Sequence, residues 1–331
     1  MNRRSYYMLY HLSMMAMGDC DPAYPAMDYL ADRFELTQEQ RYWLAFLYQA
    51  TYCAPTAWYI IQEFPDYENV DVRRLQSWWD ANKSKCYFQK DRAKIKHMNQ
   101  LVPMFKSYQS LVGDCLQEQF FVSQVQDGPP AGYERVYKQS SKVYGVGRFS
   151  LFLYLESLYR LTGLQIQPTG LDLKNAQTCR DGLCLALGFD DWVERTLNNQ
   201  QFALLTKELD NLVYELKQSN ELVDYWNVET SLCAFRKLFK SPPTRYLGYY
   251  IDRQREEIRL MEKQVSEGVD WKVLWDFRYE FFDQEDLILR PTKPIMGSPT
   301  VQFMTEVLER RQNQPSKVLF PDVGAVYDTG A

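Results

Sequence analysis

Two glycines one residue apart, Gly145 and Gly147, are the first residues in this chain whose spacing indicates chemistry. They precede an apolar run from Leu151 to Leu161 that predicts a largely buried helix. Glycines let the backbone turn tightly and present successive N–H groups, and the start of a helix attracts negative charge. We therefore expect this turn to bind an oxyanion such as a phosphate, through Gly145, Val146, Gly147, Arg148 and Ser150. A helix C-cap followed by a turn has the same glycine spacing and stays an alternative.

Cations that could bind a polyanion are concentrated between Lys83 and Lys96. Within this run Lys90, Arg92 and Lys94 lie one or two helical turns apart at most, so they could bind phosphate oxygens together. The net charge of the chain is −5, so a nucleic acid would have to be bound by such local patches rather than by overall charge. A solvated helix face is the alternative explanation of the charge run.

Two further arginines stand among apolar residues that predict helices. Arg236 shares a helical face with Glu229, which indicates a buried ion pair. A guanidinium is also the group that best matches a carboxylate. Arg180 or Arg236 could therefore bind a carboxylate of a ligand.

Several segments together resemble the phage amino acid:DNA transferases, also called α-glutamyl/putrescinyl-thymine pyrophosphorylases, which are related to helix-hairpin-helix DNA glycosylases. The resemblance covers about residues 19 to 280 and is carried by Tyr42–Tyr52, Gly145–Glu156, Gly170–Leu173, Arg180–Leu183 and Glu229–Arg236. The chain departs from lyase-type glycosylases at Phe149, where those enzymes carry a nucleophilic lysine nearby. It also lacks the closely spaced cysteines that bind their iron–sulfur centre.

The resemblance implies an enzyme that acts on double-stranded DNA carrying a modified thymine. It implies that pyrophosphate on 5-pyrophosphoryloxymethyluracil is replaced by the amine of a free amino acid or a polyamine, and we favour glycine. On this resemblance Lys90, Arg92 and Lys94 would clamp the pyrophosphate, and Arg180 or Arg236 would bind the carboxylate of the amino acid. Asp172 follows the turn at Gly145–Gly147, here called the hairpin, and its helix, as the pocket carboxylate does in the glycosylases. The resemblance therefore makes Asp172 the base that removes the proton of the amine. Capping of a helix over 173–187 is the structural alternative for Asp172. A glycosylase that excises a modified base and a non-enzymatic DNA-binding accessory protein are the alternative functions.

Other chemistries are poorly supported. The chain has no P-loop, no Gly-x-Ser-x-Gly elbow and no dinucleotide fingerprint. Its seven cysteines are scattered and only His11 and His97 are present, which argues against a zinc site or a Ser-His triad. We expect no cofactor and no metal. With no signal peptide and no long apolar run we expect a soluble protein of the cytoplasm, that of the host bacterium if the chain is phage-encoded, without a membrane partner.

Helical periodicity dominates the chain and predicts a mainly α fold: a helix-hairpin-helix, glycosylase-like architecture of two packed helical lobes with few or no strands. Helices are expected over 23–34, 38–51, 55–63, 71–81, 91–112, 132–141, 150–162, 173–187, 189–196, 200–218, 228–239, 248–266 and 270–281. One short strand is expected over 120–125. The linker Asp127–Pro130 suggests an N-terminal lobe over 1–126, a hairpin-bearing lobe over 127–290 and an irregular tail over 291–331.

Overall fold

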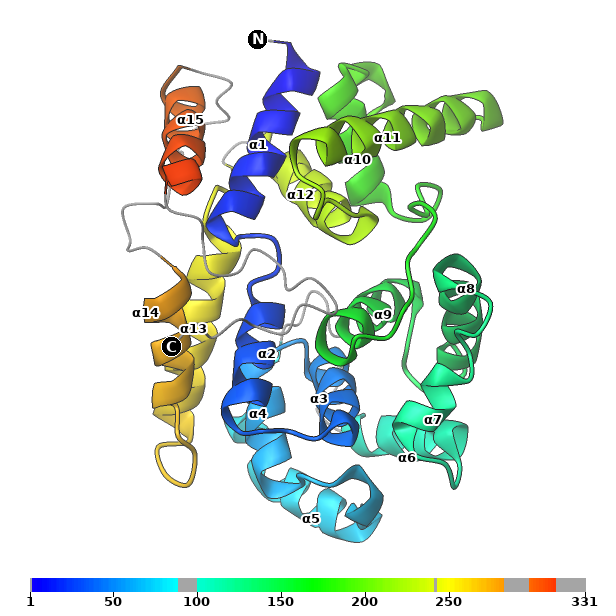
Figure 1. The fold of residues 1–331 in the computed structure, drawn as a ribbon, viewed down its shortest axis with the longest axis vertical. Helices are drawn as coiled ribbons and strands as arrows, with labels where there is room; N and C mark the ends of the chain where they lie inside the picture. The colour runs from blue at the N-terminus through cyan, green and yellow to red at the C-terminus, as the bar shows by residue number, and fades with distance from the viewer. Residues whose placement is uncertain (1, 89–99, 241–242, 283–297, 314–331) are drawn as a thin grey trace. The chain divides into compact units, whose positions relative to one another are not determined.

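The computed structural model describes residues 2–88, 100–240, 243–282 and 298–313. These residues form fifteen α-helices and three short 3-10 helices and contain no strand (Figure 1). The mainly α class is therefore confirmed. The helix-hairpin-helix, glycosylase-like architecture stays a prediction.

The contacts divide the described residues into two units, and each is described by itself. The central unit comprises residues 23–88, 100–168 and 254–278. The terminal unit comprises residues 2–22, 169–240, 243–253, 279–282 and 298–313. The segment Asp127–Pro130 lies inside the central unit, so the lobes expected over 1–126 and 127–290 do not coincide with these units.

The central unit is a set of helices around an aromatic core. Its helices are α2 (Ala23–Arg33), α3 (Gln38–Thr51), α4 (Ala54–Glu63), α5 (Val72–Asn82), α6 (Leu101–Val112), α7 (Gln117–Val122), α8 (Pro129–Ser140) and α9 (Arg148–Thr162), with the 3-10 helices η1 (Tyr67–Asn69) and η2 (Lys83–Lys85). The middle of the core is formed by Phe46, whose ring stacks on that of Tyr108 with 4.2 Å between the centroids. Trp43 is fully buried beside them and donates its indole N–H to the carbonyl of Phe64. Such packing stabilises the unit through large apolar areas removed from water.

Helices α3 and α9 pack against each other and form the frame of this unit. Helix α3 begins at the capping box that its sequence predicts: Thr37 Oγ1 accepts from the N–H of Gln40, and Gln40 Oε1 accepts from the N–H of Thr37. Helix α9 buries Leu151, Leu155 and Leu158, as its apolar run predicts. The helix begins at Arg148, directly after the turn that carries the two glycines.

The strand expected over 120–125 is wrong, because α7 (Gln117–Val122) occupies the first half of that segment and turns follow it. The carboxylate of Glu39 accepts the backbone N–H groups of Gln117, at 2.9 Å, and Glu118, at 2.7 Å, and so stabilises the first turn of α7. Phe121 is then buried against the stacked ring of Tyr42. A contact distant in sequence overrides the β propensity of the aromatic run.

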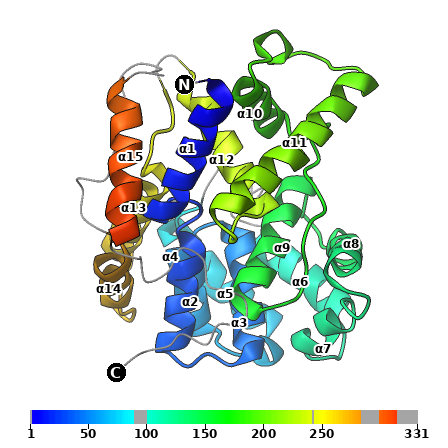
Figure 2. The same ribbon diagram turned by 45° about the horizontal axis from the view of Figure 1, so that its top comes forward.

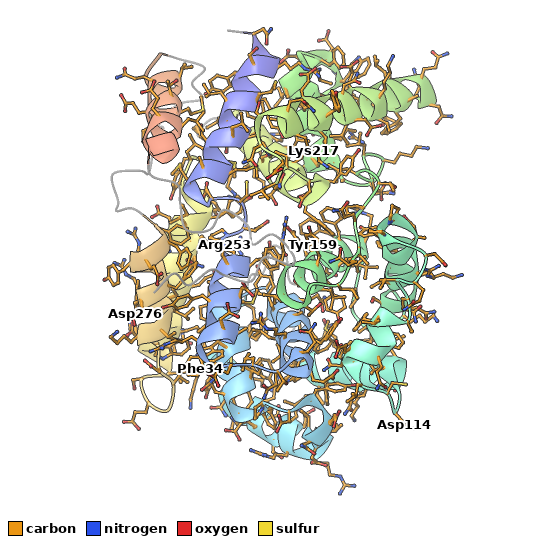
Figure 3. The ribbon with its side chains drawn as sticks, viewed as in Figure 1. Phe34, Asp114, Tyr159, Lys217, Arg253 and Asp276 are labelled. Carbon is orange, nitrogen blue, oxygen red and sulfur yellow. The ribbon has the colours of Figure 1, made fainter. Side chains whose placement is uncertain are left out.

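The terminal unit combines the start of the chain with its later helices. They are α1 (Arg3–Met17), α10 (Gln177–Leu187), η3 (Asp190–Trp192), α11 (Asn199–Ser219), α12 (Tyr225–Leu238) and α15 (Ser298–Asn313); α13 (Tyr249–Gln264) and α14 (Lys272–Phe281) contribute residues to both units. Helix α1 packs on α12, where the rings of Tyr7 and Phe235 meet edge to face. Helix α11 buries one face and exposes the other, on which Lys217 is labelled in Figure 3.

Two expectations for this unit are corrected. Within the tail expected to be irregular, residues 298–313 form α15, which lies beside α1 (Figure 2) and buries Met304 and Val307. The helix expected over 189–196 is reduced to the 3-10 turn η3, in which the rings of Phe189 and Trp192 pack with centroids 4.6 Å apart. The short apolar patterns of both segments do not indicate which partner covers them.

Helices α10 and α12 of the terminal unit approach each other closely at Gly182. A Cβ atom on Gly182 would lie 2.1 Å from the carbonyl oxygen of Leu232, far inside contact distance. Only glycine allows the two backbones to approach this closely.

Replacing Gly182 with alanine is therefore expected to lower the free energy of unfolding by about 3 kcal/mol, the upper end of the usual cost of overpacking. The matched control is Gly170→Ala in the same unit, because a Cβ there would meet nothing within 4 Å. We expect that control to stay within about 0.5 kcal/mol of the wild type. Equal unfolding curves in urea for the two variants would show that the helices do not depend on this approach.

Candidate functional site

The two glycines of the sequence motif lie in the turn between α8 and α9, within the central unit. Gly145 has the left-handed φ of +78°, which a residue without a Cβ adopts at least cost. The turn is closed by the N–H of Val146, which donates to the carbonyl of Val143. Gly147 is the N-cap of α9, and its N–H donates to Ser150 Oγ at 2.9 Å. The chain thus passes from one helix to the next through a compact turn.

Helix α6 supports this turn through Ser107 and Met104. Ser107 Oγ accepts the N–H of Tyr144 at 2.9 Å and donates to the carbonyl of Lys142 at 3.5 Å, so one hydroxyl fixes two points of the turn. The Cε atom of Met104 would lie 3.2 Å from a Cβ on Gly145, which leaves little room for a side chain there. The position of the turn therefore depends on a helix that precedes it by about forty residues, and no local sequence pattern predicts this support.

The exposed side of the turn has the chemistry of an anion site. Within the described part of the chain, the N–H of Gly145 has no hydrogen-bond acceptor, and the residue is exposed. Lys142 and Tyr144 are exposed next to it, and Arg148 is the half-buried first residue of α9. Backbone N–H groups and cations at the start of a helix suit a phosphate group. Val146 lies between the glycines and is half-buried.

Asp172 belongs to the terminal unit and is exposed. Both of its carboxylate oxygens accept from the side-chain amide of Asn175, at 2.9 and 3.1 Å, and its carbonyl accepts the N–H of Ala176. The capping role over 173–187 is wrong, because α10 begins only at Gln177 and its N-cap is Ala176. Asp172 instead orders the turn that precedes α10, in which Asn175 fixes the direction of its carboxylate.

Arg180 and Arg236, from α10 and α12, meet at a buried carboxylate. Asp181 lies between them, with its oxygens 3.6 Å from the Nε atom of each arginine. The side chain of Asp181 is 2% exposed, and it also accepts the N–H of Glu194 at 3.3 Å. The close approach of α10 to α12 places these three groups together, since Asp181 precedes the glycine at the crossing.

Glu229 is not the partner of Arg236 that the shared helical face predicts. Arg236 pairs with Asp181 and with Glu194, while Glu229 accepts from the thiol of Cys233 at 3.2 Å. The shared helical face correctly predicts that Glu229 is buried. Spacing within one helix does not indicate the acid on the neighbouring helix. Sequence reasoning named Arg180 and Arg236 and missed Asp181 and Glu194.

The structure also joins His11 to Ser231, a contact that the scattered histidines did not suggest. His11 Nδ1 lies 2.8 Å from Ser231 Oγ, and the Tyr7 hydroxyl lies 2.7 Å from the same oxygen. All three residues are fully buried, and burial lowers the pKa of His11 to about 3, so its ring is neutral. Among the described residues no hydrogen-bond partner reaches the other ring nitrogen of His11, and the three side chains are closed to solvent. This arrangement is a hydrogen-bonded cluster in the core rather than a catalytic triad.

Asp19 is a second buried acid that the sequence did not single out. Its carboxylate accepts the N–H groups of Gly248, Tyr250 and Ile251 at 2.8 to 3.1 Å and so caps the start of α13. Burial raises the pKa of Asp19 to about 8, an effect that the three N–H donors oppose. Asp19 stabilises the helix start from the opposite end of the sequence.

Lys90, Arg92 and Lys94 lie outside the described residues. Of the same basic run, Lys83 pairs with Asp80, and Lys85 donates to Asn82 at 3.0 Å. Among residues that the structure describes, no three His, Cys, Asp or Glu side chains are grouped to hold a metal ion. No described helix is both long and apolar enough to span a bilayer.

Comparison with known proteins gives two matches. Residues 15–245 match the model of a family described as amino acid:DNA transferase. The chain is also 26% identical over 304 residues to a protein of Salmonella phage ViI named Serinyltransferase, with 83% of this chain and 72% of that protein covered. No solved structure matches. The family match includes the hairpin, Asp172, Arg180 and Arg236.

Replacing Ser107 with alanine is expected to weaken binding of duplex DNA about five- to tenfold for all sequences alike, because the turn loses a hydrogen bond at two of its residues. Ser110→Ala is the matched control, since that hydroxyl donates only to the carbonyl of Lys106 on the same helix. Fluorescence anisotropy with several duplexes measures the effect. Unchanged affinity of a folded S107A protein would show that α6 does not position a DNA-binding turn.

The buried histidine predicts a specific pH dependence of stability. The folded protein holds His11 with a pKa of about 3, against 6.5 for an ordinary histidine, so between these values the unfolded chain binds more protons. The free energy of unfolding should therefore rise with pH through this window, by up to about 1.4 kcal/mol per unit from this group, and level off above it.

His11→Asn keeps a polar group near Ser231 and removes the titration. The difference in unfolding free energy between wild type and H11N, measured from pH 4.5 to 7.5, should increase with pH and then become constant. A difference that is independent of pH would contradict the buried neutral ring.

Proposed function

The chain belongs to the amino acid:DNA transferase family, and we propose that it replaces the pyrophosphate of 5-pyrophosphoryloxymethyluracil in double-stranded DNA with the amine of a free amino acid. The observation that carries the proposal is that the matched region includes both an exposed hairpin suited to phosphate and a largely buried pair of arginines suited to a carboxylate. One feature serves the DNA and the other serves the amino acid.

The proposed reaction is a substitution at the exocyclic methylene carbon of the base. The amine nitrogen forms a bond to that carbon, the bond from the carbon to the pyrophosphate oxygen breaks, and the nitrogen loses a proton. The base must leave the helical stack for this reaction, and backbone contacts at the hairpin would hold the DNA while it does so. We propose that Gly145, Val146, Gly147, Arg148 and Ser150 make these contacts.

Asp172 is the proposed general base. An amino acid carries an ammonium group at neutral pH and cannot attack until a base has taken its proton. The side chain of Asn175 orients the carboxylate, and the exposure of Asp172 leaves it accessible to a substrate. Lys90, Arg92 and Lys94 are proposed to stabilise the negative charge that grows on the departing pyrophosphate.

Glycine is the amino acid that we propose first. The similarity to a protein named Serinyltransferase makes L-serine the donor to compare with it. A polyamine such as putrescine is the third donor to test, because it has no carboxylate for Arg180 or Arg236 to bind.

The proposal is tested by incubating the protein with DNA that carries the pyrophosphorylated base and with glycine, L-serine or putrescine in turn. Digestion to nucleosides and mass spectrometry then identify the product. An aminomethyl adduct of the base supports the proposal. Release of the free base would indicate a glycosylase instead, and unchanged DNA would indicate a binding protein.

Replacing Asp172 with asparagine is expected to reduce turnover at least about 100-fold, the usual contribution of a general base, while affinity for DNA changes little. Asparagine keeps the size of the side chain and one acceptor oxygen for the turn. The matched control is Asp191→Asn, which removes the charge of another exposed acid in the same unit. Wild-type turnover in D172N would leave Asp172 with the structural role of ordering its turn.

A further inference from the structure

The pair between Arg236 and Glu194 in the terminal unit joins groups of very different exposure. The side chain of Arg236 is 13% exposed and that of Glu194 is 64% exposed. The Nη2 atom of Arg236 donates to Oε1 of Glu194. A carboxylate thus reaches a mostly buried guanidinium from the solvent side, and it comes from a loop rather than from the core.

The backbone of Glu194 is fixed independently of its side chain. Its N–H donates to the buried carboxylate of Asp181 at 3.3 Å. Its φ is +58°, in the left-handed region that a residue with a Cβ rarely adopts. Strained backbone of this kind persists where surrounding structure holds it and is frequent at ligand-binding positions. The side chain can therefore leave Arg236 without loss of the hydrogen bond between the loop and Asp181.

The three charges that meet at Asp181 do not balance by themselves. Arg180 and Arg236 carry two positive charges, and Asp181 between them carries one negative charge. The Nε atom of Arg180 is buried and has no hydrogen-bond acceptor in the described part of the chain; its Nη2 donates to the carbonyl of Arg195. The exposed carboxylate of Glu194 supplies the missing negative charge, because buried charge needs compensation.

We propose that Glu194 occupies the place of the carboxylate of the amino acid co-substrate. When the amino acid binds, its carboxylate displaces that of Glu194 from Arg236. This inference rests on the proposed function and names the residues that select an α-amino acid. The exchange is one carboxylate for another on the same guanidinium, so the charge of the buried cluster does not change. A pyrophosphate, with several negative charges, does not match a cluster that needs only one.

The competition predicts a gain of affinity when Glu194 loses its charge. Glu194→Gln should bind L-serine and glycine about two- to fivefold more tightly than the wild type, the fold change that corresponds to an exposed ion pair. Ethanolamine, which is serine without its carboxylate, should show no change. Isothermal titration of the full chain without DNA measures all three ligands.

Asp190→Asn is the matched control. Asp190 lies in η3, directly before the loop that carries Glu194; its side chain is 54% exposed and pairs with a different arginine, Arg3, at 2.5 Å. Its removal changes the net charge of the protein as E194Q does but leaves Arg236 untouched. We expect D190N to bind L-serine like the wild type.

Equal gains in E194Q and D190N, equal gains for serine and ethanolamine, or no gain in E194Q would each overturn the inference. The KM for the amino acid in the DNA reaction separates this outcome from failure of the proposed function. Turnover with an unchanged KM in E194Q would reject the displacement of Glu194 alone. Absence of any transfer by the wild type would reject the proposed function, whereas tighter binding of serine by E194Q would still support the carboxylate site.

Discussion

The approach of α10 to α12 at Gly182 is the constraint on which the arginine cluster depends. Because the Gly182 backbone lies against the carbonyl of Leu232, the residue before it, Asp181, is forced into the contact between the two helices. A carboxylate in that position requires cations, and Arg180 and Arg236 provide them from the two helices. The close contact between the two backbones thus fixes the positions of the two guanidinium groups.

The hairpin of the central unit is built on a different principle. The turn depends on the left-handed Gly145, on a helix start at Gly147 and on the hydroxyl of Ser107. Among the described residues the N–H of Gly145 has no acceptor, so it is available to a ligand. A backbone site of this kind holds phosphate without reading bases, whereas a guanidinium site with one uncompensated charge recognises a small anion. The two features therefore suit the two substrates of a transferase that joins an amino acid to DNA.

Sequence alone predicted the elements whose signals are local. The capping box at Thr37 and the apolar run after Gly147 placed α3 and α9, and the glycine spacing located the hairpin. It failed where a distant residue decides the outcome: Glu39 turns an apparent strand into α7, and the partner of Arg236 is Asp181 on another helix. Helix α15 was missed because its partner α1 lies at the other end of the chain. No sequence pattern indicates the roles of Ser107 and Glu194, since only the fold brings Ser107 to the hairpin and Glu194 to Arg236.

The proposed reaction transfers the nitrogen of an amino acid to a base in DNA with release of pyrophosphate. It is tested most directly by supplying ¹⁵N-labelled glycine or L-serine with DNA that carries the pyrophosphorylated base, and by counting both products in one reaction. We expect one ¹⁵N in a modified nucleoside for each pyrophosphate released. Pyrophosphate release without ¹⁵N in DNA, or loss of the base from its sugar, would contradict it.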